Sequence, residues 1–246
     1  MSFSLNHAVF FGRTWDECLG MYALKESDLS GIKILDCPGG PDALVAEGLI
    51  RGLDICAVDP QYDYESEVLE ARGRKEIAET MAAWQRDPDT AWGDAKAAEF
   101  QRLKLAALDS FIVAFRAHPE RYLSGSLPEL PFSDDSFDLA LSGNFLFVYA
   151  SVERGGLMST DKLGLDFHLA SVRELVRVAS EVRLFPSFAV TGPARRQEFV
   201  EPVMEALRSD GHQVDLVPAQ WVEGDFTEFN DLIRIRKADG SDKPAP

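Results

Sequence analysis

The chain has 246 residues, of which 46% are hydrophobic, and this is enough apolar material to bury one large core. Its 41 acidic and 25 basic residues give a formal net charge of −16, and no long basic run interrupts the acidic excess. This charge disfavours binding to nucleic acid or to an anionic membrane surface, so a small-molecule partner is expected.

The three cysteines, Cys18, Cys37 and Cys56, are well separated and form no Cys-x-x-Cys pair. This spacing fits reduced thiols better than a disulfide framework. The N-terminal residues lack a basic segment followed by an apolar one, and no apolar run approaches membrane-spanning length. We therefore expect a cytoplasmic protein. No His/Cys/Asp spacing resembles a metal cage, so no bound metal is expected.

The first predicted elements alternate between helix and strand. Thr14-Trp15-Asp16-Glu17 is a capping box that opens a helix to about residue 24, within an N-terminal helical segment of residues 1–30. A strand over 32–36 follows, then a helix that begins near Pro41, and then a strand over 54–58.

Residues 65–118 have a helical pattern that is broken at Asp87-Pro88-Asp89, which predicts an inserted helical layer. One face of its second half carries an apolar stripe, made of Phe100, Leu103, Ala107, Phe111 and Phe115. After the insert we predict strands over 122–124, 137–142, 181–185, 213–217 and 230–236, with helices over 166–179 and 193–209. The alternation predicts one α/β domain, residues 1–246, with helices on both faces of a mainly parallel sheet.

Two of the predicted strands end in a carboxylate. Asp36 ends the first and is followed by a Gly/Pro turn, and Asp59 ends the second, 23 residues later. In α/β nucleotide sites, the helix after such a turn opens with unpaired N–H groups that attract an anion. A second acid at about this spacing reaches the ribose hydroxyls. The pattern therefore indicates a nucleotide site at this edge of the sheet.

Four motifs then occur in a characteristic order: Leu35-Asp36-Cys37-Pro38-Gly39-Gly40-Pro41, Val58-Asp59-Pro60, residues 125–132 with Ser136-Phe137-Asp138-Leu139, and residues 175–179. In this order they resemble the motifs of class I S-adenosylmethionine-dependent methyltransferases. The resemblance covers most of the chain. It implies a Rossmann-like three-layer sandwich around a seven-stranded sheet whose last strand is antiparallel.

The resemblance also implies a cofactor site for S-adenosylmethionine, with S-adenosylhomocysteine as the product. Asp36, Gly39 and Gly40 would hold the methionine end, Asp59 would accept the two ribose hydroxyls, and Ser126 and Leu127 would contact the adenine. The family usually has glycine two, four and six positions beyond the first acid. Here those positions are Pro38, Gly40 and Asp42, so only the middle glycine is kept.

Residues after the fourth strand usually border the transferring methyl group in this family, which points to Asn144, Phe145, Phe147 and Tyr149. Asn144 is the best polar candidate there, and an amide that closes a turn explains it equally well. His168 is a candidate base near the start of a helix, although a half-exposed structural histidine is the favoured interpretation. Arg13 is a candidate partner for the methionine carboxylate, and a packing role for its amphipathic segment is the stronger alternative.

Three functional classes follow from these observations. The leading one is methyl transfer from S-adenosylmethionine to a small molecule. The second is a cofactor-binding or degenerate protein of the same fold that transfers nothing, which the altered glycine turn motivates. The third, a nicotinamide oxidoreductase, is disfavoured because G-x-G-x-x-G is absent.

Overall fold

A seven-stranded sheet forms the centre of the molecule in the computed structural model, which describes residues 4–86, 93–222 and 227–238. The strand order is β3-β2-β1-β4-β5-β7-β6. The strands are β1 (Lys33–Asp36), β2 (Asp54–Val58), β3 (Tyr122–Leu123), β4 (Phe137–Gly143), β5 (Ala179–Phe185), β6 (Gln213–Pro218) and β7 (Asp231–Arg236). The pairings among β1 to β5 are parallel, and β7 is antiparallel to both β5 and β6. This is the sheet that the resemblance implies, so the predicted fold class is confirmed.

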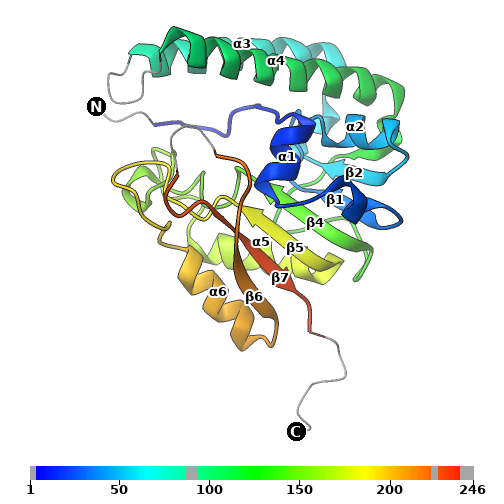
Figure 1. Cartoon of the computed structure of the whole chain (residues 1–246), viewed down its shortest axis with the longest axis vertical. Coiled ribbons are helices and arrows are strands. Elements are labelled where there is room, and N and C mark those ends of the chain that lie inside the picture. The colour runs from blue at the N-terminus through cyan, green and yellow to red at the C-terminus, as the bar shows by residue number, and fades with distance from the viewer. Residues whose placement is uncertain (1–3, 87–92, 223–226, 239–246) are drawn as a thin grey trace, which may run out of the picture.

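Helices cover both faces of the sheet (Figure 1). On one face lie α1 (Trp15–Met21), α2 (Leu44–Ile50), α3 (Ser66–Arg86) and α4 (Asp94–Ala117), and on the other lie α5 (Leu165–Val178) and α6 (Val200–Ser209). Short 3-10 helices connect some of these elements: η1 (Glu26–Leu29), η2 (Pro60–Asp63), η3 (Pro119–Arg121) and η4 (Val152–Arg154). The three-layer arrangement follows from strands that are apolar on both sides.

The predicted helical insert is a hairpin of the two long helices α3 and α4. It crosses the top of Figure 1, and the segment that precedes α1 runs beneath it. Aromatic rings join the hairpin to the sheet edge, since Phe111 stacks on Tyr62 with centroids 5.8 Å apart and meets Tyr122 edge-on at 5.4 Å. The predicted break at 87–89 lies outside the described residues.

The apolar stripe of α4 is only partly buried. Ala107 and Phe111 are fully buried, whereas Phe100, Leu103 and Phe115 are half-buried. Lys104, the residue after Leu103, is completely buried instead. An ionised lysine in such a place needs a partner, and the partner lies on α1, as described below.

The predicted capping box of α1 is confirmed. Thr14 N–H donates to the Glu17 carboxylate at 2.8 Å, and Glu17 N–H donates to Thr14 Oγ1 at 3.4 Å. The helix ends at Met21, a few residues earlier than expected.

The start of α2 was predicted near Pro41 and lies at Leu44 instead. The difference has a local cause, because Asp42 N–H donates to Gly39 O and closes a turn that includes the proline. Pro41 therefore belongs to the loop that precedes the helix.

The start of α6 was also predicted too early, at 193 instead of Val200. Residues before the helix are held in extended pairing, since Arg196 bridges Phe188 and its guanidinium donates to Ser187 Oγ at 2.8 Å. β5 begins at Ala179, where the prediction still placed helix. Both errors arise where tertiary contacts override a local helical pattern.

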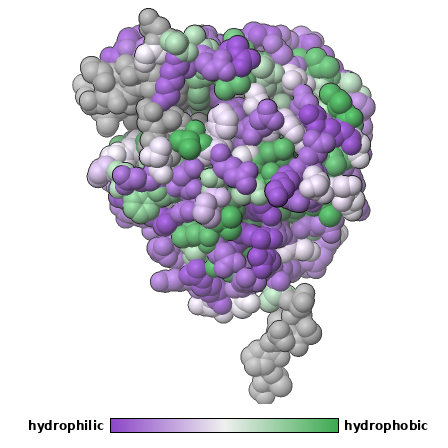
Figure 2. Space-filling view, in the orientation of Figure 1, coloured by the Kyte–Doolittle hydropathy of each residue, from purple (hydrophilic) through white to green (hydrophobic). Residues whose placement is uncertain are grey.

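The surface in the view of Figure 2 is mostly hydrophilic, with small hydrophobic patches between the polar residues. Within the described residues, no helix is both long and apolar enough to cross a membrane.

Candidate functional site

The two predicted acids lie at the carboxyl ends of neighbouring parallel strands. Asp36 is the last residue of β1, where its register partner on β2 is Ala57, and Asp59 follows directly after β2. Only 1% of Asp36 and 7% of Asp59 is exposed. In open α/β sheets this edge is where ligands bind, so the topology brings both acids to the expected place.

Asp59 is held by two main-chain donors. Its Oδ1 accepts from Gln61 N–H at 2.8 Å, which caps η2, and its Oδ2 accepts from Gly40 N–H at 3.1 Å. Burial raises the pKa of this carboxyl group, and the two bonds oppose that rise. Each carboxylate oxygen has a second lone pair, so Asp59 keeps the capacity to accept two hydroxyl groups.

The glycine turn is tightly packed against η2. Tyr62 O–H donates to Gly40 O at 2.6 Å. A Cβ added to Gly39 would lie 2.6 Å from the Tyr62 hydroxyl and 2.7 Å from Ala57 Cβ, and Gly40 has a φ of +48°. Glycine is therefore required at both positions, at Gly39 for space and at Gly40 for its conformation.

The N–H groups of residues 37–43 are all bonded inside the protein, apart from the two prolines, which have none. The bonds run from Cys37 to Leu141 O, from Gly39 to Val58 O, from Gly40 to Asp59, from Asp42 to Gly39 O, and from Ala43 to Arg13 O. The N–H groups of the turn itself are therefore not available to an anion in this conformation, and the prediction that the first turn of the following helix attracts one stays a prediction. One of these bonds, from Ala43 N–H, goes to a segment from upstream in the chain that lies on the turn.

That segment is residues 9–13, which we call the N-terminal strap. Arg13 bonds to the turn through both of its main-chain groups, because its N–H donates to the Asp42 carboxylate and its carbonyl accepts from Ala43 N–H at 2.8 Å. Gly12 is pressed against the turn, and a Cβ there would lie 2.0 Å from Pro41 O. The strap thus covers the turn directly.

The Arg13 side chain reaches the end of β4. With the Asn144 amide oriented so that its oxygen faces Arg13, Oδ1 accepts from Nη2 at 2.9 Å and from Nε at 3.1 Å. Asn144 has a φ of +51°, and its own N–H donates to Phe185 O at 2.8 Å. The structure therefore brings Arg13 and Asn144 together. Asn144 lies in a turn, as one of the two interpretations predicts, and its side chain also contacts Arg13.

A buried ion pair that the sequence did not reveal lies beside the strap. Lys104 Nζ donates to Glu17 Oε1 at 2.7 Å, with side-chain exposures of 0% and 1%. Burial raises the pKa of Glu17, but Lys104 and Arg13 outweigh it and the pKa is lowered overall. The signal in the sequence was a lysine on an apolar helical stripe, which in a packed core requires a buried carboxylate.

The pKa values of Asp36 and Asp42 are both raised, because nearby positive charge does not offset the burial of these carboxyl groups. Burial raises the pKa of Asp42 to about 7 against the opposing effect of Arg13, and burial with the neighbouring Asp42 and Asp59 raises that of Asp36. Asp36 Oδ2 and the Tyr22 hydroxyl have no hydrogen-bond partner among the described residues. Buried polar atoms are rarely left this way, and an orphaned carboxylate oxygen fits a site for a cationic or hydroxyl-bearing ligand.

The predicted adenine residues lie on the loop after β3. This loop is close to the second acid, because Asp59 N–H donates to Leu123 O at 3.2 Å. Ser126 is exposed and forms a bridge with Glu129, while Leu127 is buried. Their contact with a base stays a prediction.

The residues predicted to border the acceptor form the segment after β4. Phe147 and Tyr149 are buried and Phe145 is half-buried. The Tyr149 hydroxyl accepts from Val9 N–H at 3.0 Å, so this segment also contacts the N-terminal strap.

His168 is buried and engaged by the main chain on both sides of its ring. Nε2 accepts from Phe147 N–H at 2.9 Å, and Nδ1 lies 2.8 Å from Gly164 O, so Nδ1 carries the proton. Burial lowers the pKa of His168. The half-exposed position expected for this residue is wrong, and with both nitrogens bonded the ring acts as a brace between α5 and the segment after β4.

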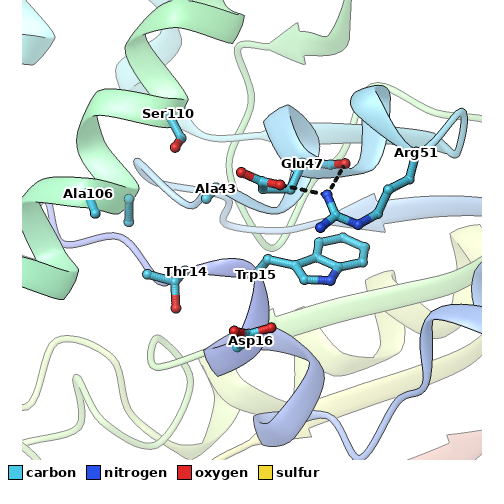
Figure 3. Close-up of a pocket in the computed structure, with 9 residues that line it drawn as sticks. Thr14, Trp15, Asp16, Ala43, Glu47, Arg51, Ala106 and Ser110 are labelled. Carbon is cyan, nitrogen blue, oxygen red and sulfur yellow. Dashed lines mark hydrogen bonds and ion pairs between the residues drawn. The ribbon is translucent and has the colours of Figure 1, made fainter.

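Two cavities lie away from these acids, along the seam between α2 and α4. One of about 260 Å³ is lined by residues that include Trp15, Glu47 and Ser110, and Figure 3 shows Arg51, the residue after α2, bonded to Glu47 there. The other, of about 620 Å³, continues past Glu47 and Ser110 along the same seam. Neither is lined by Asp36 or Asp59. Across the described ranges, no group of three or more His, Cys, Asp or Glu residues is placed to hold a metal ion.

Comparisons with known proteins add little to this geometry. No family model matches the chain. An uncharacterized protein from Methanocaldococcus jannaschii is 26% identical over 215 residues, covering 86% of this chain and 91% of that protein. The crystal structure of a SAM-dependent methyltransferase from Thermotoga maritima, described as a possible histamine N-methyltransferase, matches with 12% identity and a TM-score of 0.39, over 90% of this chain and 86% of that one. Neither match assigns an activity, so the function has to be inferred from the site.

Proposed function

We propose that the chain binds S-adenosylmethionine and transfers its methyl group to a small molecule. The observation that carries this proposal is the pair of buried acids at the carboxyl ends of β1 and β2, in a sheet with this strand order. The bond from Gly40 N–H to Asp59 joins the two acid-bearing strand ends through the glycine turn. A turn of this kind beside a ribose-type acid is the arrangement of nucleotide sites at a sheet edge.

The residues present fit this cofactor. Asp59 has lone pairs for the two ribose hydroxyls, in charge-assisted bonds. The orphaned oxygen of Asp36 and the carboxylate of Asp42 suit a ligand that carries positive charge, as the ammonium and sulfonium groups of S-adenosylmethionine do. Arg13 is the cation for its carboxylate. Ser126 and Leu127 then flank the adenine from the loop after β3.

The bound cofactor supplies an electrophilic methyl group on its sulfonium. The chain's own contribution is to align the acceptor and to exclude water, which is where most of the acceleration of such a displacement arises. In this proposal Asn144 orients the acceptor, and its position just after β4 beside Arg13 supports that role. His168 is left out of this scheme, since both of its ring nitrogens are bonded to the main chain.

Calorimetric titration with S-adenosylmethionine, S-adenosylhomocysteine and NAD tests the proposal. We expect both sulfur nucleotides to bind saturably and NAD to give no heat of binding. Replacing the ribose acceptor in Asp59→Ala should weaken binding by about tenfold or more, since it removes charged hydrogen bonds worth about 1.5 kcal/mol or more. Binding of NAD alone would favour the oxidoreductase class instead.

Matched variants separate a lost contact from a disturbed fold. Asp63→Ala removes an exposed acid from the same short helix η2 and should bind as the wild type does. Asp59→Asn keeps an oxygen to accept from Gly40 or Gln61 and should fall between the two. Circular dichroism of each variant establishes that it is folded. Equal affinity in Asp59→Ala and wild type would refute the ribose assignment.

A second candidate is a protein of this fold that binds the cofactor without transferring methyl groups. The fully paired turn and the extra carboxylate of Asp42 favour it, because both depart from an open anion site. The two candidates differ in turnover. Incubation with S-adenosylmethionine and a fractionated extract of small metabolites should yield S-adenosylhomocysteine in at least one fraction for a transferase, and in none for a binding protein.

A further inference from the structure

The N-terminal strap occupies the part of the turn where the methionine end of the cofactor is expected. Gly12 lies against Pro41, and Arg13 exchanges main-chain hydrogen bonds with Asp42 and Ala43. Asp36, whose Oδ2 has no hydrogen-bond partner among the described residues, is close enough to Asp42 for the charge of Asp42 to raise its pKa. The strap therefore covers the turn while an oxygen of the nearby Asp36 carboxyl group is left without a hydrogen bond in the part of the chain that the structure describes.

The main chain of Arg13 presents the same two functions as the end of a free amino acid. Its carbonyl accepts from Ala43 N–H, as a carboxylate would, and its N–H donates to the Asp42 carboxylate, as an ammonium would. A ligand with both charged groups makes the same bonds in charge-assisted form, and these are stronger than the neutral main-chain bonds. The Arg13 main chain thus makes, in neutral and weaker form, the hydrogen bonds that such a ligand would make to Asp42 and Ala43.

We propose that the main chain of the N-terminal strap is an internal competitor for S-adenosylmethionine: it leaves Asp42 and Ala43 when the methionine end binds, and the Arg13 guanidinium then serves as the cation for the ligand's carboxylate. The inference rests on the proposed function and adds a regulation of the same site. Binding is weakened by the fraction of molecules in which the strap is closed, and any change that opens the strap strengthens it.

Opening of the strap breaks no pairing between strands of the sheet. The strap belongs to no helix or strand. Outside the turn it is held by hydrogen bonds from Phe10 N–H to the Glu76 carboxylate at 2.6 Å, from Val9 N–H to the Tyr149 hydroxyl and from the Arg13 guanidinium to Asn144. The rings of Phe10 and Phe11 add contacts to Phe111 at 5.9 Å and to Trp84 at 6.5 Å. Segments with few main-chain bonds open at the low end of the stability range.

Two variants open the strap by independent routes. In Gly12→Ala the new methyl group would lie 2.0 Å from Pro41 O, so the strap has to move off the turn. In Glu76→Ala the acceptor for Phe10 N–H is lost from α3. The control is Gly93→Ala, which adds the same methyl group where nothing lies within 4 Å. Circular dichroism establishes the fold of each, and either opening variant suffices for the test.

The experiment is calorimetric titration of the full chain with S-adenosylhomocysteine, joined to hydrogen exchange of the peptides that contain residues 9–14. We expect each opening variant to bind about fivefold more tightly than wild type, the effect of removing one net hydrogen bond from the closed state. Gly93→Ala should bind as wild type does. In wild type, the ligand should speed exchange of the Arg13 amide.

The outcomes separate the two proposals. Tighter binding in the opening variants, or binding seen only in them, supports both the competitor and the cofactor site. Unchanged or weaker binding in them, with wild type binding normally, overturns the competitor and leaves the cofactor site standing. Slower exchange of the strap with ligand bound also overturns it, because the strap would then be a cover that closes on the ligand. Absence of binding in every folded variant overturns both.

Discussion

The two faces of the sheet bury very different side chains. Among the described residues, the face under α5 and α6 buries polar side chains such as Ser171 and His168 but no charged one, and both ring nitrogens of His168 are bonded to the main chain. The face under α1, α2 and the hairpin buries two cations, Arg13 and Lys104, together with the carboxylates of Glu17 and Asp36. Buried charge costs stability unless it is paired, so its concentration on one face indicates that the face does more than pack.

The register of β1 decides on which face the first acid lies. Ile34 belongs to the core under α1 and α2 and Leu35 to the core under α5 and α6, so the period of two returns Asp36 to the charged face. A shift of one residue would place the carboxylate on the face under α5 and remove it from Asp42 and Asp59. The contrast between the faces is therefore a consequence of strand register.

The largest effect is expected from Lys104→Met, which breaks the ion pair on the charged face. It leaves the Glu17 carboxylate, 1% exposed, without its cation. Removal of one partner of a buried pair costs about 3–5 kcal/mol of unfolding free energy. Urea denaturation measures this loss.

Two further variants control for it. Lys104→Met with Glu17→Gln should lose less than Lys104→Met alone, because no uncompensated charge is left. Lys75→Met, at a lysine 71% exposed and 3.9 Å from Glu79, should change the free energy by less than about 0.5 kcal/mol. Equal losses in Lys104→Met and the double variant would mean that packing, and not charge, dominates at this position.

A smaller effect is expected from Asp42→Asn, and it depends on pH. The pKa of Asp42 is raised by burial from 3.8 to about 7 in the folded chain, with Arg13 and Lys104 opposing the rise and Glu17 adding to it. Between these two values the unfolded chain has lost the proton and the folded chain still holds it. Wild-type stability therefore falls, relative to the variant, as pH rises from about 4 to about 7.

Denaturation of both proteins across this range measures the difference. We expect it to change by about 3 kcal/mol in favour of Asp42→Asn, given about 1.4 kcal/mol for each unit of pKa difference. A constant difference from pH 4 to pH 7 would contradict a raised pKa for Asp42.

The smallest effect is expected on the apolar face, from His168→Gln. The amide can keep one of the two main-chain bonds, so we expect a loss of about 1 kcal/mol of unfolding free energy and unchanged affinity for S-adenosylhomocysteine. Denaturation and calorimetry measure these two quantities. If methyl transfer were abolished while stability stayed at the wild-type value, His168 would be a catalytic base after all.

The sequence predicts the framework of the molecule well. The bounds of β1 and β2, the capping box at Thr14 and the seven-stranded, mostly parallel sheet follow from local patterns and from motif order. It fails where a distant segment decides the local structure. Pro41 was assigned to a helix, although the turn bond from Asp42 to Gly39 places it in the loop.

The sequence predicts the two acids of the candidate site, but it does not predict that the N-terminal strap covers the glycine turn. Asp36 and Asp59 are readable because strand ends and spacing mark them. The pairing of Ala43 with Arg13, and of Glu17 with Lys104, joins residues 30 and 87 positions apart and leaves no local pattern. Only a lysine on the apolar stripe of α4 hinted at the second pairing.

The Glu17–Lys104 pair also limits how the helical hairpin can be exchanged between proteins of this fold. A hairpin that carries Lys104 brings a buried cation to the surface of α1 and needs a carboxylate at the position of Glu17 to receive it. Grafting either element alone would leave one buried charge without its partner. A chimaeric protein that receives this hairpin therefore has to receive α1 with it.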